Sequence, residues 1–101
     1  MKTFFDGIFL DRSKLEEEGI KYPIKLEYYK TIAENENVEA KFGIEVVKTE
    51  YKSEFVNVES NKLENLTNSS KEIEKILAIL RDNEVTPIAM QDVLDDMSIE
   101  V

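Results

Sequence analysis

Three aspartates near the C-terminal end come closest, by residue type and spacing, to a chemical site. Asp92, Asp95 and Asp96 stand three, four and one positions apart, so a helix would place them on adjoining parts of one surface. Carboxylates are hard oxygen ligands of the kind that Mg²⁺ and Ca²⁺ prefer. However, the spacing matches no calcium-binding loop, and one helical face supplies few ligands. The simpler interpretation is the solvated side of an amphipathic helix.

The placement of these acids nevertheless suggests a binding surface. Carboxylates near a helix C-terminus oppose the helix dipole, at a cost of ~0.3–1 kcal/mol each. Residues 82–101 hold six acids and no base, and so carry six of the nine net negative charges of the chain. We therefore predict a contact surface for a basic partner, formed by Asp92, Asp95, Asp96 and Glu100, and we predict no metal site.

The composition excludes several kinds of catalytic site. The chain has no cysteine and no histidine, which excludes disulfides, thiolate zinc sites, catalytic cysteines and triads built on imidazole. Its three glycines are far apart and form no phosphate-binding loop. General acid–base chemistry would fall to Asp, Glu, Lys or Tyr, none of which titrates near neutrality without a shifted pKa. We expect a protein that is not an enzyme and needs no cofactor.

Charge and the N-terminal sequence limit partners and location. A net charge of −9 argues against direct binding of nucleic acid, which would be repelled. The N-terminal "MKTFFDGIFLDR" has an apolar run that is interrupted by Asp6 and closed by Asp11, so we expect neither a signal peptide nor a membrane span. The absence of cysteine fits a reducing compartment. We expect a cytoplasmic protein with another protein as its partner.

Residues 22–60 have the pattern of antiparallel strands. Apolar residues alternate in "YPIKLEYYKTIA" (22–33) and "FGIEVVKTEY" (42–51), and "EFVNVES" (54–60) follows a tight turn at 52–53. These segments predict a three-stranded meander. The segment "KLENLTN" (62–68) is either a fourth short strand or a descent toward helices.

Residues 70–98 change to the helical period. Ser69 and Glu72 form a capping box, and we expect Arg81 and then a left-handed Asn83 to end this first helix. For a second helix, Thr86 is the expected N-cap and Pro87 the first helical residue. The residues expected to face the core are Ile73, Ile76, Leu77 and Leu80 in the first helix and Ile88, Met90, Val93, Leu94 and Met97 in the second.

Together these elements predict one α+β domain over residues 1–101. It consists of a three- to four-stranded antiparallel meander followed by two C-terminal amphipathic helices packed on one sheet face. Residues 1–21 form an N-terminal apolar segment and a turn, with too much apolar area for a free tail. Because the strand at 42–51 is apolar on both parities, something should cover part of the second face. We favour the N-terminal segment, which could form a further strand followed by the turn "DRSKLEEEG", with homodimerisation as the second interpretation.

The segment "FGIEVVKTEY" and the later "NEVTPIAMQDVLDD" resemble a small family of uncharacterised proteins from clostridia and related spore-forming bacteria. The resemblance covers about residues 42–97 and is strongest at "VTP…DVLDD". In that family a histidine often stands at the position of Ala89, so chemistry based on that imidazole is absent here. The resemblance implies a bacterial cytosolic protein with a domain of unknown function, and it supplies no activity or site.

Three functional hypotheses remain. The first is a non-enzymatic interaction or regulatory protein, which leads because the usual catalytic groups are missing. The second is a nucleic-acid mimic that inhibits a DNA- or RNA-binding protein, of the kind that phages encode, although the 13 bases interleaved with acids over residues 1–81 weigh against it. The third is a carboxylate-based divalent-metal-binding protein that uses Asp92, Asp95 and Asp96.

Overall fold

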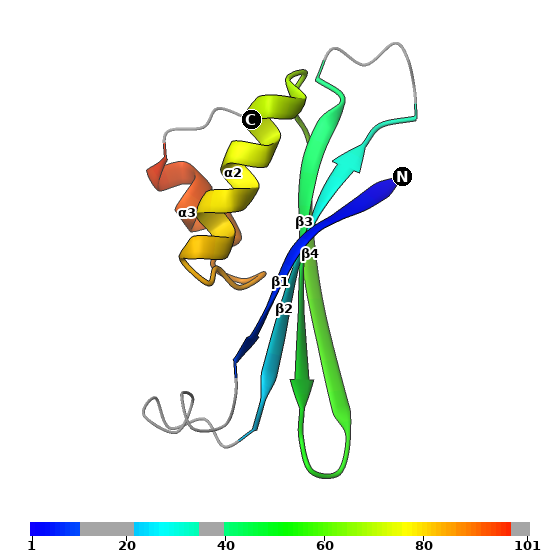
Figure 1. Ribbon diagram of the computed structural model, residues 1–101, viewed down its shortest axis with the longest axis vertical. Helices are drawn as coiled ribbons and strands as arrows, with labels where there is room; N and C mark the ends of the chain where they lie inside the picture. Colours follow the sequence, from blue (N-terminus) through cyan, green and yellow to red (C-terminus); the bar gives the residue numbers. More distant parts are fainter. Residues whose placement is uncertain (11–21, 35–39, 98–101) are drawn as a thin grey trace.

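The structure is a computed structural model that describes residues 1–10, 22–34 and 40–97. Four strands form one antiparallel sheet in the order β1-β2-β3-β4, and two helices lie on one of its faces (Figure 1). The α+β class, the meander and the C-terminal helices are thus confirmed. The elements are β1 (Lys2–Leu10), β2 (Ile24–Ile32), β3 (Phe42–Tyr51), β4 (Val56–Thr67), α2 (Ser70–Asp82) and α3 (Met90–Asp96).

The identity of the fourth strand differs from the expectation. The apolar N-terminal segment does not cover the second face of the sheet. Residues 2–10 instead pair with β2 as an edge strand. Residues 62–67 are not a separate strand, because β4 runs unbroken from Val56 to Thr67. The predicted turn "DRSKLEEEG" (11–19) lies outside the described residues.

The core forms between the helices and the strand residues of one parity. Leu26, Tyr28, Ile44 and Val46 point from the two central strands toward the helices and are completely buried. Alternation along a strand sends every second side chain to the same face, so the buried set follows from the register in which Tyr28 pairs with Val46 and Leu26 with Lys48. Helix α2 packs across all four strands.

Helix α2 begins and ends with capping motifs. Ser69 is the N-cap, as predicted, and its hydroxyl accepts a 3.2 Å hydrogen bond from the N–H of Glu72. The other half of the predicted capping box does not form, because the Ser69 N–H donates to Thr67 Oγ1 at 3.1 Å. At the other end Glu84, with a φ of 51°, takes the left-handed conformation that was expected of Asn83. The Val85 N–H binds the Leu80 carbonyl and the Glu84 N–H binds the Arg81 carbonyl, which is a Schellman motif. Asn83 contributes its side chain instead, donating to Ile79 O.

Helix α3 is shorter than predicted. It begins at Met90 with Ala89 as its N-cap, so the expected helix start at Thr86 and Pro87 was wrong. The Thr86 hydroxyl accepts a 3.4 Å bond from the Ala89 N–H and so closes a turn that precedes the helix. Within α3, Met90 and Leu94 are fully buried, whereas Ile88, expected in the core, is 79% exposed.

One ion pair ties the edge strand β1 to α2. The Arg81 guanidinium donates to Asp6 Oδ2 at 3.0 Å, and its carbon lies 5.6 Å from the centre of the Phe5 ring. The hydrogen bond from the Gly7 N–H, followed by the one from Arg81, lowers the pKa of Asp6. The apolar N-terminal strand is thereby held in register beneath the helix.

Candidate functional site

The three aspartates predicted to bind a partner lie on the outer side of α3. Asp92, Asp95 and Asp96 are all exposed, on the side of the helix opposite the buried Leu94. Asp95 accepts a 3.0 Å hydrogen bond from Gln91 Nε2. Within residues 1–10, 22–34 and 40–97 no base lies in ion-pair distance of these carboxylates, and the last turn of α3 contains none. Glu100, the fourth predicted residue, lies outside the described residues.

The aspartates do not assemble into a cation site. Among the residues that the structure describes, no group of three or more His, Cys, Asp or Glu side chains is placed to hold a metal ion. Divalent cations of the Mg²⁺ or Ca²⁺ type need several oxygen ligands that converge on one point. The geometry therefore gives the carboxylate–metal hypothesis no support, and the acidic side of α3 remains a candidate contact surface.

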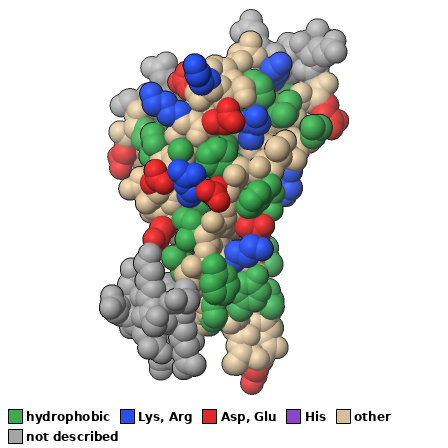
Figure 2. All heavy atoms as spheres, viewed as in Figure 1, with side chains coloured by type: hydrophobic (Ala, Val, Ile, Leu, Met, Phe, Trp, Pro, Cys, Tyr) green, Lys and Arg blue, Asp and Glu red, His purple; other side chains and the backbone are tan. Residues whose placement is uncertain are grey.

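A second surface emerges that the sequence pattern did not assign. We call the sheet face that points away from the helices the open face. None of the described segments lies over it, and its strand residues have the parity opposite to the core. Figure 2 shows hydrophobic side chains gathered over the lower part of the strands, below the helices, whereas acids and bases intermingle above. Its large exposed apolar residues are Phe4, Phe9, Tyr51, Val56 and Val58.

Ring contacts organise the aromatic residues of the open face. Phe4 meets Tyr29 edge-on, with ring centres 5.6 Å apart, and Phe9 lies 6.3 Å from Tyr51. Burial first, and then the hydrogen bond that Tyr29 donates to Glu27, raises the pKa of Tyr29. The pattern could have been found in the sequence, because alternation along a strand places Val56 and Val58 on the same face. Which face they share depends on the register, and the sequence does not specify the register.

A buried carboxylate stands on the helix side of the sheet, near the β3–β4 turn. Glu50 accepts hydrogen bonds from Asn57 Nδ2 at 2.7 Å and from Tyr22 Oη at 2.8 Å, and Lys48 Nζ lies 3.8 Å away. The Asn57 bond chiefly, with help from Tyr22 and against the effect of burial, lowers the pKa of Glu50. In return the carboxylate raises the pKa of Tyr22. Every oxygen of Glu50 is thus occupied, which suits a structural role better than proton transfer.

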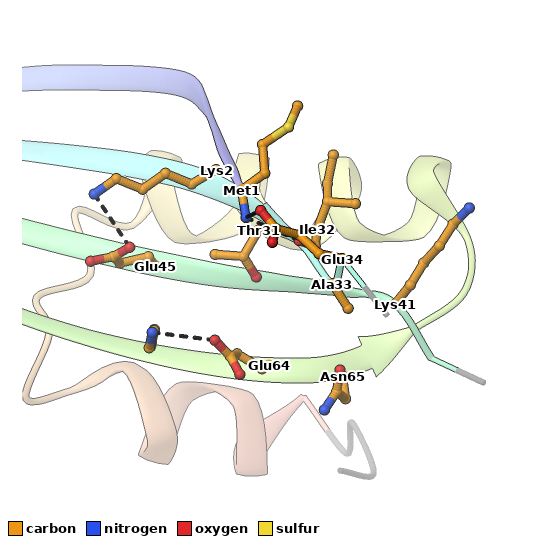
Figure 3. A pocket seen from close by; sticks show the side chains of 11 residues that line it. Met1, Lys2, Thr31, Ile32, Ala33, Glu34, Lys41, Glu45, Glu64 and Asn65 are labelled. Atoms are coloured by element: carbon orange, nitrogen blue, oxygen red, sulfur yellow. Dashed lines mark hydrogen bonds and ion pairs between the residues drawn. The ribbon is translucent and has the colours of Figure 1, made fainter. Parts of the chain in front are cut away.

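A depression of about 500 Å³ lies at one end of the sheet, and Met1, Ile32 and Lys41 are among the residues that line it (Figure 3). Its charged groups are mostly paired with one another. Lys2 Nζ lies 3.4 Å from Glu45, and Lys62 Nζ lies 3.2 Å from Glu64. A ligand would have to break these pairs to gain charge–charge contacts of its own, so the depression is a weak candidate for a small-molecule site.

Comparison with known proteins places the chain in a family and goes no further. Neither the curated proteins nor the solved structures contain a match. In the part of the chain that the structure describes, no helix is long and apolar enough to cross a membrane. A family model matches residues 8–100, which extends well beyond the 42–97 segment that carried the resemblance. The chain therefore belongs to the family of unknown function DUF6514.

Proposed function

We propose that this chain is a small non-enzymatic interaction or regulatory protein of the bacterial cytoplasm, from a clostridial or related source. The observation that carries the proposal is the one-sided cover of the sheet. The helices bury one face, while the other exposes two phenylalanines, a tyrosine and two valines. Exposed apolar area of this kind is typical of a surface that binds another macromolecule.

The chemistry of the chain supports a binding role. Histidine and cysteine are absent from the sequence. Glu50, the buried acid among the residues that the structure describes, has both oxygens occupied by hydrogen bonds. A general base needs a free oxygen or nitrogen and a pKa near the working pH, and Glu50, with a lowered pKa and both oxygens occupied, does not suit that role.

The acidic side of α3 is the second surface in the proposal, and it would contact a basic segment of a partner protein. Asp92, Asp95 and Asp96 project away from the sheet and are not neutralised by a neighbouring base among the described residues. Charge of one sign on an exposed face mainly raises association rates and selects partners of the opposite sign. On the sheet, by contrast, glutamates alternate with lysines, as in the Lys25–Glu27 pair at 3.7 Å. That mixture favours a local protein contact over imitation of a phosphate backbone.

Affinity capture with matched charge variants tests this proposal. The test variant is Asp92→Lys/Asp95→Lys/Asp96→Lys. The control, Glu54→Lys/Glu72→Lys/Glu74→Lys, makes the same change of net charge at three other exposed positions. We expect wild type and control to retain the same partner from native cytosol at moderate salt, and the α3 variant to lose it. Equal capture by both variants, or no specific partner for wild type, would refute the role of α3.

A further inference from the structure

The open face has an apolar half and a charge-paired half. Phe9, Tyr51, Val56 and Val58 lie together toward the β3–β4 turn, and Phe9 and Val58 are each about 60% exposed, at 61% and 60%. Lys25 shares the row of Phe9 and Val58 and Glu27 lies at mid-sheet, while the remaining charged residues of this face lie toward the other end of the strands: Lys2, Glu45, Lys62 and Glu64. The charged strand residues of this face form three pairs, Lys2–Glu45, Lys25–Glu27 and Lys62–Glu64.

These three pairs make the open face electrically neutral in a chain of net charge −9. A face without net charge gives a basic partner little to recognise. It is instead the surface through which two copies of an acidic protein can meet with least mutual repulsion, because like charges facing each other across an interface are strongly unfavourable. The charge distribution therefore favours a second copy of this chain as the occupant.

The strand register makes the face complementary to itself. Phe9 pairs with Lys25, Lys25 with Thr49, and Thr49 with Val58, so one row crosses the sheet from edge to edge. A two-fold axis parallel to the strands keeps each row at its own height and exchanges the two edges. Phe9 of each copy then lies against Val58 of the other.

The same operation matches the next rows. The adjacent row is Gly7, Glu27, Val47 and Ser60, and there the two-fold axis places Glu27, which is paired with Lys25 of its own copy, over Val47 of the other. In the row after it, Phe4 lies over Lys62 and Tyr29 over Glu45 of the other copy. A lysine over an aromatic ring and a phenol beside a carboxylate are both favourable contacts. No like charges are brought together in either row.

The available area is sufficient for a dimer in solution. Four strands spaced about 4.8 Å apart, with about nine residues rising about 3.3 Å each, present roughly 600 Å² per copy, or roughly 1,200 Å² in total. A specific interface needs about 1,000 Å². Two sheets can stack with such faces about 10 Å apart and their strands within about 30° of each other.

We propose that the open face is a homodimer interface, in which two copies pack sheet against sheet about a two-fold axis parallel to the strands. The inference rests on the proposed binding role of the open face and names its partner. It leaves the acidic sides of both α3 helices outward on opposite surfaces of the dimer, so each dimer would present two sites to a basic partner.

Sedimentation equilibrium on the purified full chain, at concentrations up to roughly 100 µM, tests the interface. We expect a wild-type dimer, and about a tenfold or greater rise in its dissociation constant for Phe9→Lys and for Val58→Glu. The double variant Phe9→Lys/Val58→Glu should recover most of the affinity, because the axis places those two positions together. Ile88→Lys, at a residue 79% exposed on the helix side, is the matched control and should remain dimeric.

Two results would overturn the inference. One is a monomeric wild type over this range, which would leave the α3 proposal standing because partner capture tests that surface separately. The other is a dimer whose dissociation constant is unchanged by Phe9→Lys and by Val58→Glu. That result would be expected if the two copies met through their strand edges instead of their open faces. Circular dichroism on each variant checks folding, and rescue by the double variant would show that the single substitutions act on the interface rather than on the fold.

Discussion

The phenol of Tyr28 donates a 2.9 Å hydrogen bond to the main-chain carbonyl of Val85. Tyr28 stands in the middle of β2 and is fully buried, while Val85 follows α2 by three residues. Burial first, and then the Glu84 carboxylate, raises the pKa of Tyr28, so the phenol keeps its proton at neutral pH. This bond fixes the position where the chain leaves α2 and turns toward α3.

Removing that hydroxyl should destabilise the fold. Tyr28→Phe leaves the buried Val85 carbonyl without its donor, which we expect to lower the free energy of unfolding by about 1–3 kcal/mol. Tyr29→Phe is the control, because its hydroxyl bonds a partly exposed Glu27 side chain and should cost about 0.5 kcal/mol. Urea titration of dilute samples measures both. Equal losses would mean that the Tyr28 bond does not anchor the turn.

Gly43 should not tolerate a side chain. The register shift between Phe42 and Ile44 brings β4 against it, and a Cβ atom there would contact Leu63 O and lie 2.8 Å from the Cα of Glu64. We expect Gly43→Ala to lower the free energy of unfolding by about 1–3 kcal/mol, as overpacking does. At Gly7 the nearest atoms to a new Cβ lie at 3.4 Å, so Gly7→Ala should cost less. Thermal unfolding of the two variants measures the difference. A Gly43→Ala protein as stable as wild type would contradict the close approach of β4 at this bulge.

The Glu50 carboxylate should make the free energy of unfolding depend on pH in the acidic range. Its pKa is lowered below the ordinary 4.5 in the folded protein, so its contribution is present above that value and disappears as pH falls through the folded pKa. The stability gap between wild type and Glu50→Gln should therefore narrow from about pH 6 to about pH 3. Urea titrations at each pH measure the gap, with the exposed Glu54→Gln as control. A gap that stays constant or widens would show that the carboxylate is not stabilised by its neighbours.

The strongly periodic elements could be predicted from the sequence. The strand at 42–51 matches β3, and Ser69 caps the helix that follows. In each case one local rule, alternation in the strand and capping in the helix, agrees with the packing that the core requires. These segments could be predicted because their local preferences agree with their tertiary packing.

The role of the N-terminal segment could not be predicted, because a bulge hides its alternation. Phe4 pairs with Tyr29 and Asp6 with Tyr28, so Phe5 is an extra residue. Phe4 therefore faces the open side, whereas Ile8 and Leu10 beyond the bulge point to the core. A bulge moves the apolar residues from one side of the strand to the other midway, so the sequence lacks the alternation that would show this segment to be an edge strand of the sheet rather than a cover over its second face.

The start of α3 and the open face were missed for other reasons. Thr86 and Pro87 are a valid start signal, but the N–H that Thr86 binds belongs to a turn that ends at Ala89. The apolar character of Val56 and Val58 was visible, yet their side of the sheet is set by pairing with Tyr51 and Thr49. Pairing register is a long-range property that local pattern does not contain.

A thiol-labelling experiment tests the central claim most directly, since the chain contains no cysteine of its own. Single cysteines at Val58 on the open face and at Asp92 on α3 would be labelled under native, reducing conditions over a range of protein concentrations. We predict that Val58→Cys reacts rapidly when dilute and progressively more slowly as concentration rises, while Asp92→Cys reacts rapidly throughout. Two results would contradict the account: a Val58→Cys thiol that stays protected in dilute protein, or one whose labelling rate does not change with protein concentration.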